Sequence, residues 1–128
     1  MPSQPQPATL PRQLRLRKRA SFQRVFRYRL TASDRWMTLR AAPGEQSYTR
    51  LGIAVGRAFG NAVRRNRIKR LIREAFRHTR HTLPPGLDLV VLPRPGNQPQ
   101  AHELKQSLYG LAHRIAKRRS HTPGSHPD

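Results

Sequence analysis

Hydrophobic residues in the middle of the chain recur with the periods of helices and strands, whereas both ends lack such a pattern. Between residues 14 and 118 the apolar positions are interrupted by turns rich in Pro and Gly, at residues 43–44, 84–86 and 93–99. The first 13 residues and the last 10 are rich in Pro, Gln, Ser and His. We therefore predict one folded domain over residues 14–118, flanked by disordered tails at 1–13 and 119–128.

Three segments have the patterns of β-strands. Residues 36–42 alternate, with Met37, Leu39 and Ala41 on one face and Trp36, Thr38 and Arg40 on the other. Residues 51–55 alternate large apolar residues with Gly and Ala, so another element can approach one face closely. Residues 87–92 are almost continuously apolar, which is typical of a strand covered on both faces.

Three further segments have the spacing of amphipathic helices. A short one is predicted over residues 21–29, where Phe22, Val25 and Phe26 share a face. A long one is predicted over 62–80, with Asn61 as its N-cap, and a third over 100–117. Together with the strands, these helices predict a compact α/β domain.

The long helix has an apolar face and a basic face. The apolar stripe predicts the side that packs on the sheet: Ile68, Leu71, Ile72, Ala75, Phe76 and Thr79. The opposite side and its flanks carry Asn66, Arg67, Lys69, Arg70, Arg73 and Arg77. Arg64 and Arg65 fall on the azimuth of the apolar stripe, where an unpaired guanidinium is costly to bury. We therefore expect the first turn to overhang the core and to meet solvent or an anion.

The charge of the chain predicts a polyanionic partner. The sequence holds 26 Lys and Arg against 6 Asp and Glu, a formal net charge of +20. Glu74 is the only acid in the long helix, so its cations repel one another and a merely solvated basic face is disfavoured. The helix N-terminus after Gly60 and Asn61, with basic residues in the first turns, is suited to phosphate.

Other compartments and chemistries are disfavoured. No apolar run exceeds four residues, so we expect no membrane span or secretory signal, and a cytoplasmic protein. Without cysteine there is no disulfide and no Cys-based zinc site. The acids are scattered, and His78 and His81 lack a third ligand, so we predict no catalytic residue and no stably bound metal. Spacing alone leaves open a metal-independent ribonuclease that uses histidines and a lysine.

Residues 59–77, FGNAVRRNRIKRLIREAFR, resemble the signature of the bacterial ribonuclease P protein subunit. The core of the resemblance is Arg-Asn-Arg-Ile-Lys-Arg at residues 65–70, preceded by Gly-Asn-Ala-Val at 60–63. A looser similarity runs from the Phe-x-x-Val-Phe segment at residues 22–26 to the final helix, about 100 residues in all.

The resemblance implies a fold and a function. The implied fold is an α/β (α+β) two-layer sandwich in the order α-β-β(β)-α-β-α, with a left-handed β-α-β crossover against the usual right-handed preference. The implied function is that of an accessory subunit, with no catalytic residue of its own and no obligate protein partner. The partners are the catalytic ribonuclease P RNA, which binds most of the Mg²⁺, and precursor tRNA, from which the 5′ leader is removed.

The resemblance also assigns two binding sites. The predicted site for the catalytic RNA comprises Arg64, Arg65, Asn66, Arg67, Lys69, Arg70 and Arg73. The predicted leader site comprises Phe22, Phe26, Trp36, Arg40 and Arg57, with aromatic faces for stacking of unpaired bases. Two positions depart from the family pattern, since relatives often have an aromatic residue in place of Arg40, and Ser and two lysines at residues 56–58.

Three alternatives remain open at the level of sequence. Phe22 and Phe26 are either stacking residues or simply part of the core. A helix-turn-helix DNA-binding protein is disfavoured, because residues 50–56 read as a strand where that motif needs a helix. A ribosomal protein or an RNA chaperone without a processing role fits the composition equally well.

Overall fold

The structure, a computed structural model, describes residues 10–96 and 98–120. Three α-helices and four strands follow one another in these residues: α1 (Arg19–Arg27), β1 (Leu30–Ser33), β2 (Met37–Pro43), β3 (Arg50–Ile53), α2 (Ala62–Thr79), β4 (Leu87–Pro93) and α3 (Ala101–Ser120). Short 3-10 helices lie at Arg12–Leu14, Arg57–Phe59 and Arg80–Thr82. The element order is the one that the resemblance implies.

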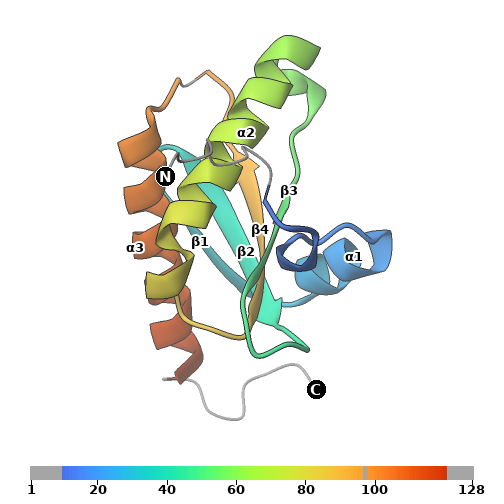
Figure 1. Cartoon of the computed structure of the whole chain (residues 1–128), viewed down its shortest axis with the longest axis vertical. Helices are drawn as coiled ribbons and strands as arrows, with labels where there is room; N and C mark the ends of the chain where they lie inside the picture. The colour runs from blue at the N-terminus through green and yellow to red at the C-terminus, as the bar shows by residue number, and fades with distance from the viewer. Residues whose placement is uncertain (1–9, 97, 121–128) are drawn as a thin grey trace, which may run out of the picture.

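The four strands form one mixed sheet in the order β1-β2-β4-β3. Strand β2 is antiparallel to β1 and β4, whereas β3 and β4 are parallel and joined through α2. In Figure 1 both parallel strands run upward behind α2, and the chain passes from β3 to its left-hand neighbour β4. The crossover is therefore left-handed, as the resemblance implies.

The main core lies between the sheet and the helices α2 and α3. Alternate strand residues such as Met37, Leu39, Leu89 and Val91 point to this side and are completely buried. They meet the predicted apolar stripes of both helices: Ile68, Ile72, Ala75 and Phe76 of α2, and Leu104, Leu108, Leu111 and Ile115 of α3. The first turns of α2 extend past the sheet at the top of Figure 1, so the predicted overhang is confirmed.

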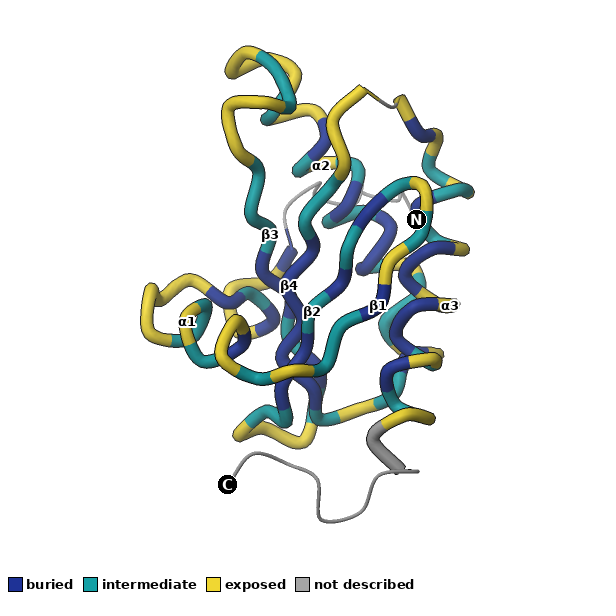
Figure 2. The backbone as a smooth tube through the Cα atoms, turned by 180° about the vertical axis from the view of Figure 1, so that it is seen from behind, coloured by how far each residue is buried: buried dark blue, intermediate teal, exposed yellow. Residues whose placement is uncertain are grey.

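The opposite face of the sheet is covered only in part, by α1. A smaller cluster of Leu16, Val25, Ala42 and Val90 joins α1 to this face, with Phe22, Tyr28, Ala54 and Leu92 around it. In Figure 2 the central strands are largely buried, whereas α1 is largely exposed or half-buried. The sheet therefore lies between a thick layer and a single short helix, and part of its α1 side stays uncovered.

Three features of the helices and strands differ from the prediction. Helix α1 begins at Arg19, two residues before residue 21, with Lys18 as an N-cap that makes no side-chain hydrogen bond. Strand β1 was not predicted, because its four residues are too few to show an alternating pattern. Its antiparallel pairing with β2 stabilises it. Strand β3 ends at Ile53 and not at residue 55.

The predicted domain boundaries are also displaced at both ends. Leu10 is only 2% exposed and packs into the main core, so residues 10–13 belong to the fold and not to a tail. A single buried leucine in a Pro-rich segment has no period to reveal it. Helix α3 continues to Ser120, past the predicted limit at 118. The remaining predicted tails, 1–9 and 121–128, lie outside the described residues.

Candidate nucleic-acid interface

The turn before α2 fixes where its basic residues begin. The side chain of Asn61 accepts a hydrogen bond from the backbone N–H of Arg64 at 3.0 Å, which confirms the predicted N-cap. Gly60 has φ 141°, a conformation that favours glycine, and a Cβ at this position would lie 2.8 Å from Cδ of Arg64. Glycine therefore lets the stem of Arg64 fold back over the turn.

The predicted residues for the catalytic RNA lie along α2, but they do not form one uniform ridge. Four of them are exposed: Arg64, Asn66, Arg67 and Arg70. The other three, Arg65, Lys69 and Arg73, are half-buried. Glu74, the only acid of the helix, pairs with Arg77 at 3.8 Å and leaves these cations without an acid of their own helix. The exposed residues present an uncompensated basic surface to solvent.

Lys69 and Arg73 face the segment before α1. They line a cavity of about 130 Å³ together with Arg15 and Arg17, and among the described residues its lining includes no carboxylate. Burial lowers the pKa of Arg73, and the nearby charge of Arg15 lowers it further. The Nε of Arg15 is buried and makes no hydrogen bond within the described part of the chain. Four cations thus converge on a space suited to an anion.

Sequence reasoning missed Arg15 and Arg17 because they precede the first predicted helix. In the structure Leu16 donates a hydrogen bond to the carbonyl of Leu51 at 2.9 Å, and Arg15 forms a parallel bridge with the same residue. The segment therefore runs beside β3 as a short extension of the sheet. Only the density of basic residues from position 12 to 19 signalled a role.

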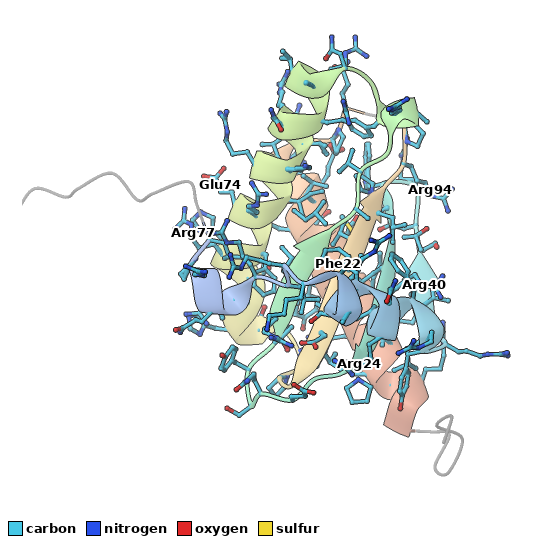
Figure 3. The ribbon with its side chains drawn as sticks, turned by 90° about the vertical axis from the view of Figure 1, so that its right-hand side faces the viewer. Phe22, Arg24, Arg40, Glu74, Arg77 and Arg94 are labelled. Atoms are coloured by element: carbon cyan, nitrogen blue, oxygen red, sulfur yellow. The ribbon has the colours of Figure 1, made fainter. Side chains whose placement is uncertain are left out.

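Three predicted leader residues, Phe22, Phe26 and Arg40, come together where α1 crosses the sheet. Phe22 packs closely on β3, since a Cβ on Gly52 would lie 2.6 Å from Cζ of its ring. Phe26 is 36% exposed, and the guanidinium of Arg40 lies 5.3 Å from its ring centroid. Arg40 also donates a hydrogen bond to the carbonyl of Phe26 at 2.8 Å. Figure 3 shows Phe22 and Arg40 along α1 on this face. We call these three residues the cleft cluster.

The other two predicted leader residues, Trp36 and Arg57, lie outside the cleft cluster. Trp36 precedes β2 in the hairpin turn, where its backbone carbonyl accepts from Arg94 at 2.9 Å and Arg35 stacks on its ring at 4.8 Å. Arg57 is exposed in the 3-10 helix after β3. Both are at the end of the sheet where β2 begins and β4 ends, which is the end that α2 overhangs.

An ion cluster under α1 sets the position of the cleft cluster. Asp88 of β4 is completely buried and pairs with Arg24 of α1 and Arg50 of β3. The two bonds from Arg50 measure 3.0 and 2.8 Å, and hydrogen bonding to Asp88 raises the pKa of Arg50. Arg24 also donates to the carbonyl of Pro43 at 2.7 Å. Sequence reasoning missed this cluster, although an acid inside an apolar strand demands a buried cation.

The remaining acids in the described residues have structural partners, apart from the exposed Glu45, whose charge acts on Arg50. Asp34 accepts from the backbone N–H groups of Trp36 and Met37 and from the hydroxyl of Ser107, at 2.6 to 3.1 Å. Glu103 accepts from the backbone N–H of Gln100 at the start of α3. Within residues 10–96 and 98–120, three His, Asp or Glu side chains do not gather anywhere as a possible metal site.

The geometry suits the binding of a charged, partly unpaired polymer. Cations line α2 and its junction with the N-terminal segment, and an aromatic–Arg cluster lies on the other face of the sheet. In the part of the chain that the structure describes, none of the helices is long and apolar enough to cross a membrane.

Comparisons with known proteins agree on one family. A family model described as Ribonuclease P matches residues 10–116. The Ribonuclease P protein component of Chlamydia trachomatis serovar D is 45% identical over 101 residues, which are 78% of this chain and 83% of that protein. The one from Brevibacillus brevis is 45% identical over 96 residues, 73% and 76% of the two chains. The solved ribonuclease P protein from Thermotoga maritima superposes with a TM-score of 0.70 at 33% identity, covering 78% of this chain and 96% of its own.

Proposed function

The chain belongs to the ribonuclease P protein family, and from that premise we propose how it takes part in tRNA 5′ processing. It binds the catalytic ribonuclease P RNA through α2 and the single-stranded 5′ leader of precursor tRNA through the cleft cluster. The observation that carries this proposal is the separation of the two sets: the exposed cations of α2 and the cleft cluster lie on opposite sides of the sheet.

The surface for the catalytic RNA is built on the exposed side of α2. Arg64, Arg67 and Arg70 project from its first two and a half turns, beside the polar side chain of Asn66. Guanidinium groups donate two hydrogen bonds to one phosphate and release counterions from the RNA. This end of the helix extends beyond the sheet, so a folded RNA can reach it without touching α1.

The surface for the leader is built around Phe26 and Arg40. The exposed part of the Phe26 ring offers a stacking face, and Arg40 closes one side of it with a planar cation. Aromatic and guanidinium faces accept any base, so the site suits leaders of different sequence. Trp36 and Arg57 extend this path toward the far end of the sheet. Phe22 acts mainly as support, because it packs against Gly52.

The chemistry belongs to the RNA in this proposal. Asp34, Asp88, Glu74 and Glu103 are engaged in turns, ion pairs and a helix start, so they are committed to the fold. Mg²⁺ held mainly by the RNA would activate the water that hydrolyses the phosphodiester, and the protein would lower the Mg²⁺ requirement by neutralising phosphates. The proposal places the protein in the cytoplasm with its two RNA partners.

Reconstitution tests this function directly. We expect purified, RNA-free protein to leave precursor tRNA intact. With the catalytic RNA added, cleavage at the 5′ end of the mature tRNA appears at Mg²⁺ concentrations at which the RNA alone is slow. Metal-dependent cleavage by the protein without RNA contradicts the proposal. So does a failure of the protein to increase the rate at low Mg²⁺.

A further inference from the structure

A second, larger pocket lies beside the first half of α2. It has a volume of about 600 Å³ and lies between α2 and the residues that connect β4 to α3. Its apolar lining includes Phe59, Ile68, Leu71, Pro99 and Ala101. Arg64 and Arg67 line it from the exposed side of α2. We call it the α2–α3 pocket.

We propose that the α2–α3 pocket receives one unstacked nucleobase of the catalytic RNA, an inference that rests on the proposed function. The volume is in the range of pockets that enclose small organic groups. Its lining combines an aromatic and aliphatic floor with two guanidinium groups. A nucleotide within an RNA strand matches this lining. Its flat base suits the apolar floor, and the negatively charged phosphates before and after it suit the two guanidinium groups.

The charge of the lining selects this occupant. The lining residues include two arginines and no Asp or Glu. An apolar side chain of a protein would fit the floor, but it would leave both guanidinium groups without a partner charge. When the base is inserted, the phosphodiester groups on its two sides can form ion pairs with Arg64 and Arg67 at the same time. Contact with phosphates alone would need only the exposed helix surface and no apolar floor.

The floor of the pocket is anchored in the folded domain. Ile68 is 3% exposed and belongs to the main core, and Pro99 is also buried. Phe59 and Leu71 are half-buried and pack against that core while they face the pocket. Arg64 is directed by its close approach to Gly60. A formed pocket loses little conformational entropy on binding, which favours insertion of an unpaired base.

Substitution of Phe59 separates base stacking from phosphate contact. We expect Phe59→Leu, which keeps apolar bulk but removes the aromatic face, to weaken binding of the catalytic RNA by about fivefold to a hundredfold, the range for one lost stack. The dependence of binding on salt should stay unchanged, because no ion pair is lost. Phe59→Tyr should bind as the unchanged protein does. Tyr109→Leu removes an exposed aromatic ring of α3 outside the pocket and serves as the control.

A second variant protects the test against a folding defect. Ala101 lines the pocket at the start of α3 and is half-buried, so Ala101→Leu fills the pocket with a good helix former and leaves the floor intact. We expect a similar loss of affinity, with an unchanged thermal midpoint. A scan of the catalytic RNA with single abasic nucleotides should find one position that weakens binding of the unchanged protein but not of Phe59→Leu.

The outcomes distinguish this inference from the function on which it rests. If Arg67→Ala weakens RNA binding while Phe59→Leu and Ala101→Leu do not, the RNA contacts α2 without using the pocket, and the inference is wrong. A protein side chain then becomes the better occupant. If none of the three substitutions changes RNA binding, the proposed function itself fails.

Discussion

Arg24 of α1 donates a hydrogen bond to the completely buried carboxylate of Asp88 in β4, which ties the only helix on this face to the centre of the sheet within the described residues. Arg50 holds the same carboxylate from β3 at 2.8 and 3.0 Å. Removing a charge from such a buried cluster leaves its partners uncompensated. Phe26 follows Arg24 by two residues in the same short helix, so anchoring of α1 by this cluster also positions Phe26.

We expect Asp88→Asn to lower the free energy of unfolding by about 2–4 kcal/mol, because two guanidinium groups lose their counter-charge in a buried site. Arg24→Ala should cost less, since Arg24 is partly exposed and Arg50 stays paired. Urea unfolding monitored by circular dichroism measures both. Glu74→Gln breaks the long, partly exposed pair with Arg77 and is the control, with an effect below about 1 kcal/mol. Equal effects of Asp88→Asn and the control would contradict the structural role.

Gly52→Ala tests the close packing of Phe22 on β3. The new methyl group would lie 2.6 Å from Cζ of Phe22 and 3.1 Å from Cβ of Leu16, so the ring must move. We expect a loss of about 1–3 kcal/mol in stability from this overpacking. In a Phe22→Leu background the same substitution should cost less, because the nearest atom has been removed. Additive losses in the double variant would show that Phe22 is not the obstacle.

Long periodic segments made the main core predictable from sequence, and isolated residues did not. The stripe from Ile68 to Phe76 and the alternation of Met37, Leu39 and Ala41 each repeat several times, so their inner faces were identified correctly. Leu10 and the four residues of β1 repeat nothing, and only tertiary contacts define them. The left-handed crossover came from the resemblance alone, because periodicity carries no handedness.

The candidate site was predictable where residues lie on one element. The exposed cations of α2 follow from helical spacing, and so does the shared face of Phe22 and Phe26. Lys69 and Arg73 line one cavity with Arg15 and Arg17, which lie about 50 residues earlier in the chain. The spacing of residues within a helix cannot predict such a contact between distant segments. The link of Asp88 to Arg24 is of the same kind. The sequence placed Arg40 and Phe26 in the same predicted site, but it did not predict that the guanidinium group would contact the ring.

Arg67→Ala combined with Arg70→Ala should weaken binding of the catalytic RNA by about 1–3 kcal/mol in total and reduce the slope of affinity against salt. Both side chains are exposed on α2, so the fold should tolerate the change. Titrations at several salt concentrations give the affinity and the slope. Lys105→Ala with Lys117→Ala removes the same charge from α3 and is the matched control. If the control lowers the affinity equally, net charge and not the α2 surface drives binding.

Phe26→Leu should weaken the holoenzyme's binding of precursor tRNA by about 1–3 kcal/mol, because one base–aromatic stack is lost. Mature tRNA has no leader, and its binding should be unchanged. Arg40→Lys keeps the charge but loses the planar group over the Phe26 ring, so a smaller loss of the same kind is expected. Parallel titrations with the two RNAs measure the difference. An equal loss for both RNAs would place the leader elsewhere and make Phe26 a structural residue.

Sulfate should raise the thermal midpoint of the free protein more than chloride does at equal ionic strength. Four cations line the smaller cavity, and burial, followed by the charge of the neighbouring Arg15, lowers the pKa of Arg73. An anion that binds this site only when the chain is folded stabilises it by mass action, by about 1.4 kcal/mol at ten times its dissociation constant. Chloride at the same ionic strength screens the repulsion without bridging the guanidinium groups.

Arg73→Met assigns the sulfate effect to this cavity. The substitution removes a half-buried cation but keeps an unbranched apolar side chain, so in dilute chloride we expect the variant to be more stable than the unchanged protein. Its gain from sulfate should be smaller, because one of the four ligands is missing. Lys117→Met removes an exposed cation of α3 as the control and should keep the full gain. Scanning calorimetry in matched sulfate and chloride buffers measures all three proteins. If sulfate and chloride shift the unchanged protein equally, the anions act by screening alone and the cavity binds none of them.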